Sequence, residues 1–229
     1  MDGIQNAANS GLWAGGGICG AIHGAAGPRL ADACDALPIV ECKESVRPDG
    51  VGPPGGAAGG AAGAGAGAGD DEEGSSSDGG IFGIFKVASG GGGGGGGGGY
   101  SSKYALQWGD RCDAGDTKVT EGFRLHAKFV LHTVGPMGIK PATLRSAYRS
   151  ALDAAVAHGM RTVAFCCIST GIYGYPSKRA TPVALSAVRE WLLEGDHRAA
   201  VDRVIFCVFE DKDRTLYEMY MPTFFPTSP

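Results

Sequence analysis

The chain has 229 residues and a formal net charge of −4, because its 24 aspartates and glutamates outnumber its 20 lysines and arginines. This charge argues against nucleic acid or an anionic membrane as the main partner. It is compatible with a phosphorylated ligand, because the backbone N–H groups at the start of a helix bind anions without lysines.

The first predicted element is a short strand over residues 2–5, and the segment Asn6–Pro28 follows it. Three consecutive glycines, Gly15 to Gly17, let the backbone approach a ligand without a Cβ in the way. The first turn of the helix that follows offers unpaired N–H donors and a partial positive charge, which suit a diphosphate. The amide side chains of Asn6 and Asn9 suit ribose hydroxyls. This segment is therefore our candidate for a phosphate-and-sugar site.

A helix is predicted over Ile18–Leu37, because Leu30, Cys34 and Leu37 recur at helical spacing. The Gly27-Pro28 pair is expected to break or restart this helix, since proline lacks the backbone N–H that a helix interior needs.

The composition changes over residues 46–102, which combine alternating Gly and Ala, an acidic patch, a serine run and ten consecutive glycines at Gly90–Gly99. Such a segment buries too little apolar surface to offset its ordering entropy. We therefore predict one discontinuous domain, made of residues 1–45 and 103–225, with a disordered Gly/Ala-rich insertion at 46–102. The apolar stretch Ile81–Val87 inside it is either a docking segment or an incidental patch.

The rest of the chain alternates strands and helices. We predict a turn leading into a strand at Cys112–Thr120, strands at Lys128–Val134, Arg161–Ser169 and Arg203–Phe209, and helices at Thr143–His158, Thr181–Leu193 and Arg214–Met221. This order implies an α/β protein with a mainly parallel sheet and helices on both faces.

Two glycine-bearing loops, Ala14–Gly17 and Ser169–Gly174, are expected at the carboxyl ends of strands. Ligands of such sheets bind beyond those ends. Two loops from distant segments can hold one diphosphate from opposite sides, which indicates a dinucleotide-like ligand.

Three motifs resemble a known family. Asn6–Asn9 with the glycine triplet and Ile18–His23, then Lys128–Pro136, then Ile168–Pro176, are similar to the signature of macrodomains, the family of ADP-ribose binders and ADP-ribosyl hydrolases. The match is nearest to the MacroD-type hydrolase branch. The resemblance implies a three-layer α/β/α fold with a mainly parallel mixed sheet. Family members usually carry two more strands upstream and a Gly-Asp-Ile segment, so we expect the first strands to be missing here, through a late start or a true loss.

The resemblance also implies a set of ligand-binding residues. In this sequence they are Asn6, Gly15, Gly16, Gly17, Ile18, Ser169, Thr170, Gly171, Ile172, Tyr173 and Gly174. Asn6 has a structural alternative, in which it ties the strand end to the loop. Tyr173 stands where an aromatic ring packs against the proximal ribose, and its alternative is a filler of the core.

Asn9, Cys19 and His23 are the candidate catalytic residues. The resemblance implies that Asn9 holds the proximal ribose, although by itself it reads as a capping or turn residue. Cys19 stands where MacroD-type hydrolases have an aspartate, and a neutral thiol does not replace a general base. It either lines the site as a small residue or takes part directly. His23, one helical turn later, is either an active-site contact or a structural histidine. His132 is expected to be a core histidine bonded to backbone.

Seven cysteines, two of them adjacent at Cys166 and Cys167, fit a reducing compartment better than a disulfide framework. No Cys-x-x-Cys pair or His-x-x-x-His spacing points to a zinc site. We predict free thiols, no structural metal and no cofactor.

The function implied by the resemblance is binding of ADP-ribose and hydrolysis of ADP-ribosyl esters, either mono-ADP-ribosyl protein or O-acetyl-ADP-ribose. The alternatives are a non-catalytic ADP-ribose-binding module and a truncated, poorly folded product. The expected partner is ADP-ribose or an ADP-ribosylated protein, with no nucleic acid and no membrane, and the expected state is a cytoplasmic or nuclear monomer.

Overall fold

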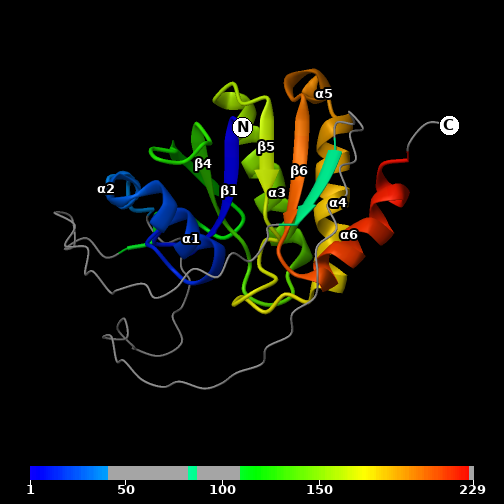
Figure 1. Cartoon of the computed structure of the whole chain (residues 1–229), viewed down its shortest axis with the longest axis horizontal. Helices are drawn as coiled ribbons and strands as arrows, with labels where there is room; N and C mark the ends of the chain where they lie inside the picture. Colours follow the sequence, from blue (N-terminus) through cyan, green and yellow to red (C-terminus); the bar gives the residue numbers. More distant parts are fainter. Residues whose placement is uncertain (41–81, 87–108, 227–229) are drawn as a thin grey trace, which may run out of the picture. The chain divides into compact units, whose positions relative to one another are not determined.

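The computed structural model describes residues 1–40, 82–86 and 109–226. Six strands in this part of the chain form one sheet in the order β2-β6-β5-β1-β4-β3 (Figure 1). The strands are β1 (Gly3–Ala8), β2 (Phe82–Lys86), β3 (Thr117–Glu121), β4 (Phe129–Val134), β5 (Thr162–Phe165) and β6 (Arg203–Val208). Neighbouring strands run parallel except β3 and β4, which pair antiparallel. The predicted mainly parallel mixed sheet is confirmed.

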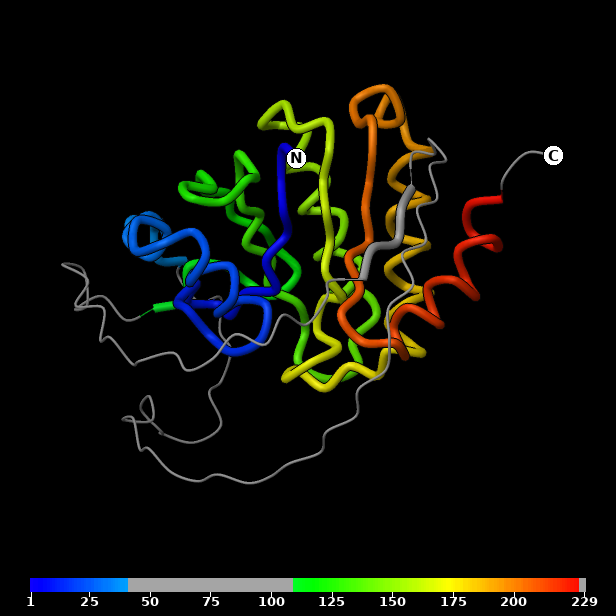
Figure 2. Tube along the Cα trace, viewed as in Figure 1, coloured from blue at the N-terminus to red at the C-terminus, as the bar shows by residue number. Residues whose placement is uncertain are grey.

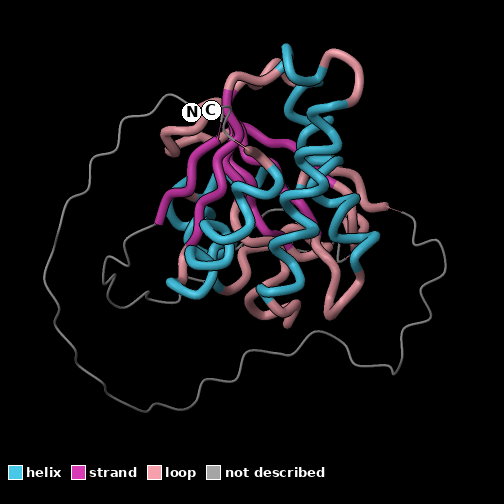
Figure 3. Tube along the Cα trace, turned by 90° about the vertical axis from the view of Figure 1, so that its right-hand side faces the viewer, coloured by secondary structure: helices cyan, strands magenta, loops and turns pink. Residues whose placement is uncertain are grey.

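Helices cover both faces of the sheet, so the fold has three layers, as predicted. They are α1 (Gly17–Ala26), α2 (Pro28–Asp35), α3 (Pro141–Ala157), α4 (Ser177–Leu193), α5 (His197–Ala200) and α6 (Asp211–Phe224). One hydrophobic cluster joins α3, α4 and α6 to β4, β5 and β6, and a second joins α1 and α2 to the other face of β1 and β4. In the view of Figure 3 the strands form a twisted layer with helices beside it. None of the helices in the described ranges is long and apolar enough to cross a membrane.

The glycine-proline pair after α1 separates two helices, as predicted. Gly27 has φ +83°, a conformation that favours glycine. Pro28 then occupies the first turn of α2, where a missing N–H loses no helical hydrogen bond. This break turns the chain so that α1 and α2 pack over β1 and β4.

Several element boundaries differ from the prediction. Strand β1 continues to Ala8, so Asn6 lies within a strand and not in the loop. Strand β5 ends at Phe165, well before Ser169. Helix α4 begins at Ser177, ahead of the predicted start at Thr181.

Strand β2 comes from the range predicted to be a disordered insertion. Phe82–Lys86 pairs in parallel register with Val204–Val208 of β6. Phenylalanine and isoleucine favour strands, and β6 offers an open backbone edge to pair with. The prediction of disorder is therefore wrong for these five residues, which form a strand. The other residues of 46–102 lie outside the described part of the chain, and the proposed domain division stays a prediction.

The trace in Figure 2 shows how the site is positioned. β1 lies between β4 and β5, and the three strands run parallel. Their carboxyl ends therefore meet at one edge, where the loops that follow β1 and β5 come together.

Candidate functional site

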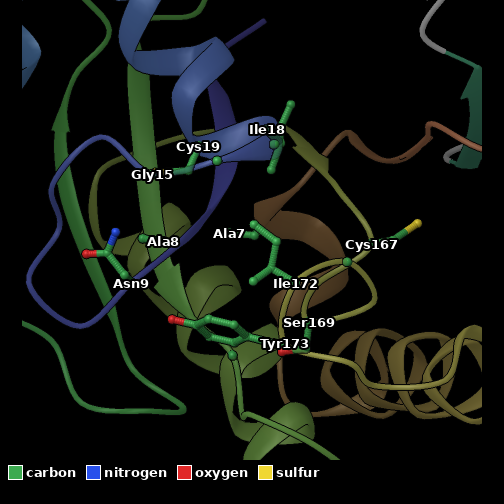
Figure 4. Close-up of a pocket in the computed structure, with 14 residues that line it drawn as sticks. Ala7, Ala8, Asn9, Gly15, Ile18, Cys19, Cys167, Ser169, Ile172 and Tyr173 are labelled. Atoms are coloured by element: carbon green, nitrogen blue, oxygen red, sulfur yellow. The ribbon is translucent and has the colours of Figure 1, made fainter. Parts of the chain in front are cut away.

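A pocket lies at the carboxyl ends of β1, β4 and β5, between the two glycine-bearing loops (Figure 4). Its lining residues are Ala7, Ala8, Asn9, Gly15, Gly16, Gly17, Ile18, Cys19, Gly135, Cys167, Ser169, Gly171, Ile172 and Tyr173. The expected meeting of the two loops in one cleft is therefore confirmed.

Asn9 shapes the first loop. Its Nδ2 donates to the Trp13 carbonyl at 2.8 Å, and its Oδ1 accepts from the Trp13 N–H at 3.2 Å. The Leu12 N–H donates to the Asn9 carbonyl at 3.0 Å, and Leu12 is held at φ +61°. Asn9 is thus a turn residue, which was the alternative to its role at the ribose, and it also lines the pocket. The two roles are compatible.

Side chains lie close to two glycines of the first loop. A Cβ on Gly15 would lie 3.3 Å from Asn9 Nδ2, and a Cβ on Gly16 would lie 3.0 Å from Ile172 Cδ1. Gly16 is therefore the point where the two loops approach one another. It is also the N-cap of α1 and has no side chain to occupy the first-turn N–H groups. A helix start of this kind is an anion site.

The second loop holds a strained residue with an unpaired hydroxyl. Ser169 has φ +66°, which is rare for a residue other than glycine. It is 7% exposed, and its Oγ has no hydrogen-bond partner among the described residues. Gly135 lies against it so closely that a Cβ would overlap Ser169 Oγ. Strain and an unsatisfied polar group at one pocket wall are typical of a ligand site.

Two further side chains define the chemistry of the pocket. The Cys19 thiol donates to the Trp13 carbonyl at 3.6 Å and accepts from Asn6 Nδ2 at 3.6 Å. Burial raises the pKa of Tyr173, so its phenol is neutral. In Figure 4 the Ile172 side chain lies between the first loop and Tyr173, and the Cys167 sulfur points away from the other labelled groups.

Four predicted site residues lie outside the pocket lining. Thr170 and Gly174 instead make bonds within the second loop, to Cys167 and Gly171. Asn6 is fully buried on β1, which agrees with its structural alternative.

His23 does not line the pocket, so the active-site contact considered for it is not seen. It faces the sheet from α1 and is 7% exposed. Burial lowers its pKa, which keeps the ring neutral. Neither ring nitrogen has a hydrogen-bond partner in the described ranges.

His132 corrects another expectation, because it bonds to side chains and not to backbone. Asn6 Nδ2 lies 3.2 Å from its Nδ1, and Thr120 Oγ1 lies 2.9 Å from its Nε2. Cys34 Sγ lies 3.7 Å from the same Nε2. Burial lowers the pKa of His132 to about 3. Sequence reasoning missed this cluster because its members come from β1, α2, β3 and β4. The helical spacing of Cys34 shows only that it faces inward.

The thiols of the described residues are free, as predicted. They are Cys19, Cys34, Cys112, Cys166, Cys167 and Cys207. Cys42 lies outside the described residues. Burial raises the pKa values of Cys34 and Cys166 to about 12, so neither is a thiolate at neutral pH.

The fold and the pocket define an α/β/α protein with a pocket between two glycine loops at the carboxyl edge of the sheet. The Macro domain family model matches residues 5–50 and 95–184, and the chain belongs to this family.

Similar proteins agree with this assignment. The ADP-ribose glycohydrolase MACROD1 of Bos taurus is 34% identical over 234 residues, which cover 100% of this chain and 49% of that protein. The Macro domain-containing protein CT2219 of Chlorobaculum tepidum is 34% identical, with 95% and 86% covered. The crystal structure of a Trypanosoma brucei macrodomain in complex with ADP-ribose has a TM-score of 0.62 and 29% identity, with 96% and 63% covered. The chain thus spans about half the length of the Bos taurus relative.

Proposed function

We propose that this chain binds ADP-ribose in the pocket between the two loops. The observation that carries the proposal is the pairing, in one pocket, of the first turn of α1 with the strained second loop. The helix start supplies backbone N–H donors for the diphosphate, and the unpaired Ser169 hydroxyl supplies one more. Asn9 stands beside these donors, where an amide side chain suits the adjoining ribose.

The proposed reaction is hydrolysis of an ADP-ribosyl ester, on mono-ADP-ribosyl protein or on O-acetyl-ADP-ribose. The names of the MACROD1 and MACROD2 relatives, ADP-ribose glycohydrolases, support it. Water attacks at or near the C1″ carbon of the proximal ribose, the ester C–O bond breaks and the carboxylate leaves, while the loops stabilise the developing charge. Asn9 positions the sugar, and the Cys19 thiol lies at the same wall.

A non-catalytic ADP-ribose-binding module is the second candidate, and the make-up of the pocket favours it. No aspartate, glutamate or histidine is among the described residues that line the pocket. Cys19 stands where the hydrolase branch carries a carboxylate. An enzyme built this way must position water through the substrate phosphate and backbone, or through the thiol.

One experiment separates the two candidates. The purified chain is titrated with ADP-ribose and then incubated with a mono-ADP-ribosylated protein. The hydrolase predicts release of ADP-ribose, reduced in Asn9→Ala. Binding without release identifies the binding module, and a gain of release in Cys19→Asp then assigns the missing activity to position 19. Absence of binding contradicts both candidates.

The remaining expectations concern the partners. We propose that the chain acts as a monomer on ADP-ribose or ADP-ribosylated protein in the cytoplasm or nucleus, without a nucleic-acid partner. The net charge of −4 supports the last point. The molar mass of the purified chain, measured by analytical ultracentrifugation, tests whether it is a monomer.

A further inference from the structure

Three potential metal ligands meet in the core between α1, α2 and β4. His23 comes from α1, Cys34 from α2 and His132 from β4. All three residues are buried, and one ligand atom of each lies within 4.8 Å of the other two. We call this group the His-Cys-His cluster. No two members are close enough in sequence to form a recognisable metal motif, so spacing alone does not reveal it.

The spacing of the three ligand atoms suits three corners of a tetrahedral cation site. Zinc bonds of about 2.3 Å to sulfur and about 2.0 to 2.1 Å to nitrogen place neighbouring ligand atoms about 3.5 Å apart. Cys34 Sγ lies 3.7 Å from His132 Nε2. The third ligand, His23, needs only a small side-chain adjustment to close the same sphere, because its atom already lies within 4.8 Å.

His23 gives an independent indication of a ligand. The ring is 7% exposed, and both of its nitrogens lack a hydrogen-bond partner among the described residues. Buried polar groups are almost always paired, so an imidazole with two unpaired nitrogens needs an explanation. A cation held by one of them would account for that nitrogen.

We propose that His23, Cys34 and His132 form a zinc-binding site that fastens α1 and α2 to β4. Zinc takes imidazole nitrogen and thiolate sulfur together. On binding, the Cys34 S–H bond breaks, its electron pair forms the bond to Zn²⁺, and the proton passes to solvent. Both histidines bind as neutral rings. The proposal is independent of the proposed function, since the cluster lies outside the pocket lining.

Asn6 provides the supporting contact that a histidine ligand needs. Asn6 Nδ2, a donor, now faces His132 Nδ1, so the proton of that ring sits on Nε2 and points to Thr120 Oγ1. Asn6 Oδ1 has no partner in the described part of the chain. A half-turn of the amide presents Oδ1 to an Nδ1–H, so that the proton leaves Nε2, and it gives up the Asn6 Nδ2 bond to Cys19. Amide acceptors behind a ligating histidine fix its tautomer in this way. The Thr120 hydroxyl, which lies 2.9 Å from Nε2, must rotate away to make room for the metal.

Cobalt(II) tests the site in the full chain, without a tag and after treatment with a chelator. We expect a one-to-one titration that produces a thiolate-to-cobalt charge-transfer band and the visible bands of tetrahedral Co²⁺, with Zn²⁺ abolishing both. We also expect Zn²⁺ at about a hundred times its Kd to raise the melting temperature by roughly 5 to 10 °C.

The variants decide whether this cluster is the site. Cys34→Ser is expected to abolish the charge-transfer band, and His23→Gln to weaken cobalt binding at least tenfold. His23→Gln covers the case in which Cys34→Ser does not fold, because the His23 ring makes no described hydrogen bond that would be lost. Cys207→Ser on β6 and the exposed His126→Gln are matched controls and keep the band. The proposal is overturned if the wild-type chain gives no thiolate band, or if the band survives both Cys34→Ser and His23→Gln.

Discussion

Ser169 shows at the scale of one residue how a pocket can be prepared for a ligand. Its hydroxyl is buried without a partner among the described residues, and its backbone is left-handed. We expect Ser169→Ala to weaken ADP-ribose binding by roughly ten- to a hundredfold, the size of one hydrogen bond to a charged group. The melting temperature is expected to stay level or rise, since an unpaired buried hydroxyl is removed. Calorimetric titration and thermal melts measure the two effects.

Ser186→Ala is the matched control. Its hydroxyl donates to the Val183 carbonyl within α4, and it does not line the pocket. Its affinity for ADP-ribose should equal that of the wild type. Unchanged binding in Ser169→Ala would show that the hydroxyl does not contact the ligand.

Sequence reasoning located the loops but not the direction of every side chain in them. Asn9 and Cys19 line the pocket as expected. Asn6 and His23 turn into the core, because β1 continues through Asn6 and because His23 lies on the buried face of α1. A motif fixes the order of residues along the chain, whereas the strand end and the helix rotation decide which of them reach a ligand.

Two of the glycines of helix α1 have opposite requirements. A Cβ on Gly20 would overlap the Gly15 carbonyl oxygen, which is backbone and cannot turn away, while a Cβ on the exposed Gly24 would meet nothing within 4 Å. We expect Gly20→Ala to destabilise the fold by about 1 to 3 kcal/mol. Gly24→Ala should stabilise it by up to about 1 kcal/mol, the difference in helix propensity.

Urea unfolding of both variants and of the wild type measures these changes. The two substitutions are identical in chemistry and lie one turn apart on the same helix, so each controls the other. Equal effects would mean that α1 does not press on the glycine loop.

Asp2 ties three strands together where they begin. Its carboxylate accepts from Lys128 Nζ at 2.9 Å, from Thr162 Oγ1 at 2.9 Å and from the Arg161 N–H at 3.1 Å. These bonds, that of Lys128 first, lower the pKa of Asp2 below its ordinary 3.8. A carboxyl group with a lowered pKa stabilises the fold at pH values above its pKa in the unfolded chain. This stabilisation is lost as the pH falls through the pKa of the group in the folded chain.

We therefore expect Asp2→Asn to lower the melting temperature at pH 7. The difference from the wild type should shrink as the pH falls below about 4, where the unfolded carboxyl takes up its proton. Glu218→Gln, in an exposed pair with Arg214 on α6, should have little effect. A difference between Asp2→Asn and the wild type that is constant from pH 7 to pH 3 would rule out this account.

Among the elements, those with strong periodicity were predicted well. Helices α3 and α4 and strands β4 and β6 follow from their apolar spacing, because each buries a continuous face. Strand β2 was missed because glycine-rich sequence surrounds it, so its pairing depends on the free edge of β6. The four-residue helix α5 is too short to give a periodic signal.

For the molecule as a whole, the buried histidines contribute to the loss of stability in acid. Burial lowers the pKa of His132 from 6.5 to about 3 and also lowers that of His23. The unfolded chain binds protons on these histidines near pH 6.5, whereas the folded chain binds them only at lower pH. Between the pKa of the unfolded chain and that of the folded chain, unfolding therefore takes up protons. We expect the free energy of unfolding to fall with decreasing pH from about 6.5, by up to about 1.4 kcal/mol per pH unit for each proton.

Urea titrations of the metal-free chain between pH 7 and pH 4 test this slope. In His132→Gln the slope should be smaller by up to one proton, whatever its stability at pH 7. His126→Gln, which removes an exposed ring outside the core, is the comparison variant. A wild-type stability that does not change over this range would contradict the assignment.

The position of β2 in the sheet has a consequence for the connections on either side of it. In sequence β2 falls between α2 and β3, yet it pairs at the edge opposite to β3. The backbone must therefore traverse the full width of the sheet after β2, five strand spacings of about 4.8 Å each. At about 3.3 to 3.6 Å per extended residue, some eight residues would bridge that distance. Residues 87–108, which connect β2 to the described segment that begins at Gly109, number 22 and exceed this minimum, and removing Gly90–Gly99 would still leave twelve.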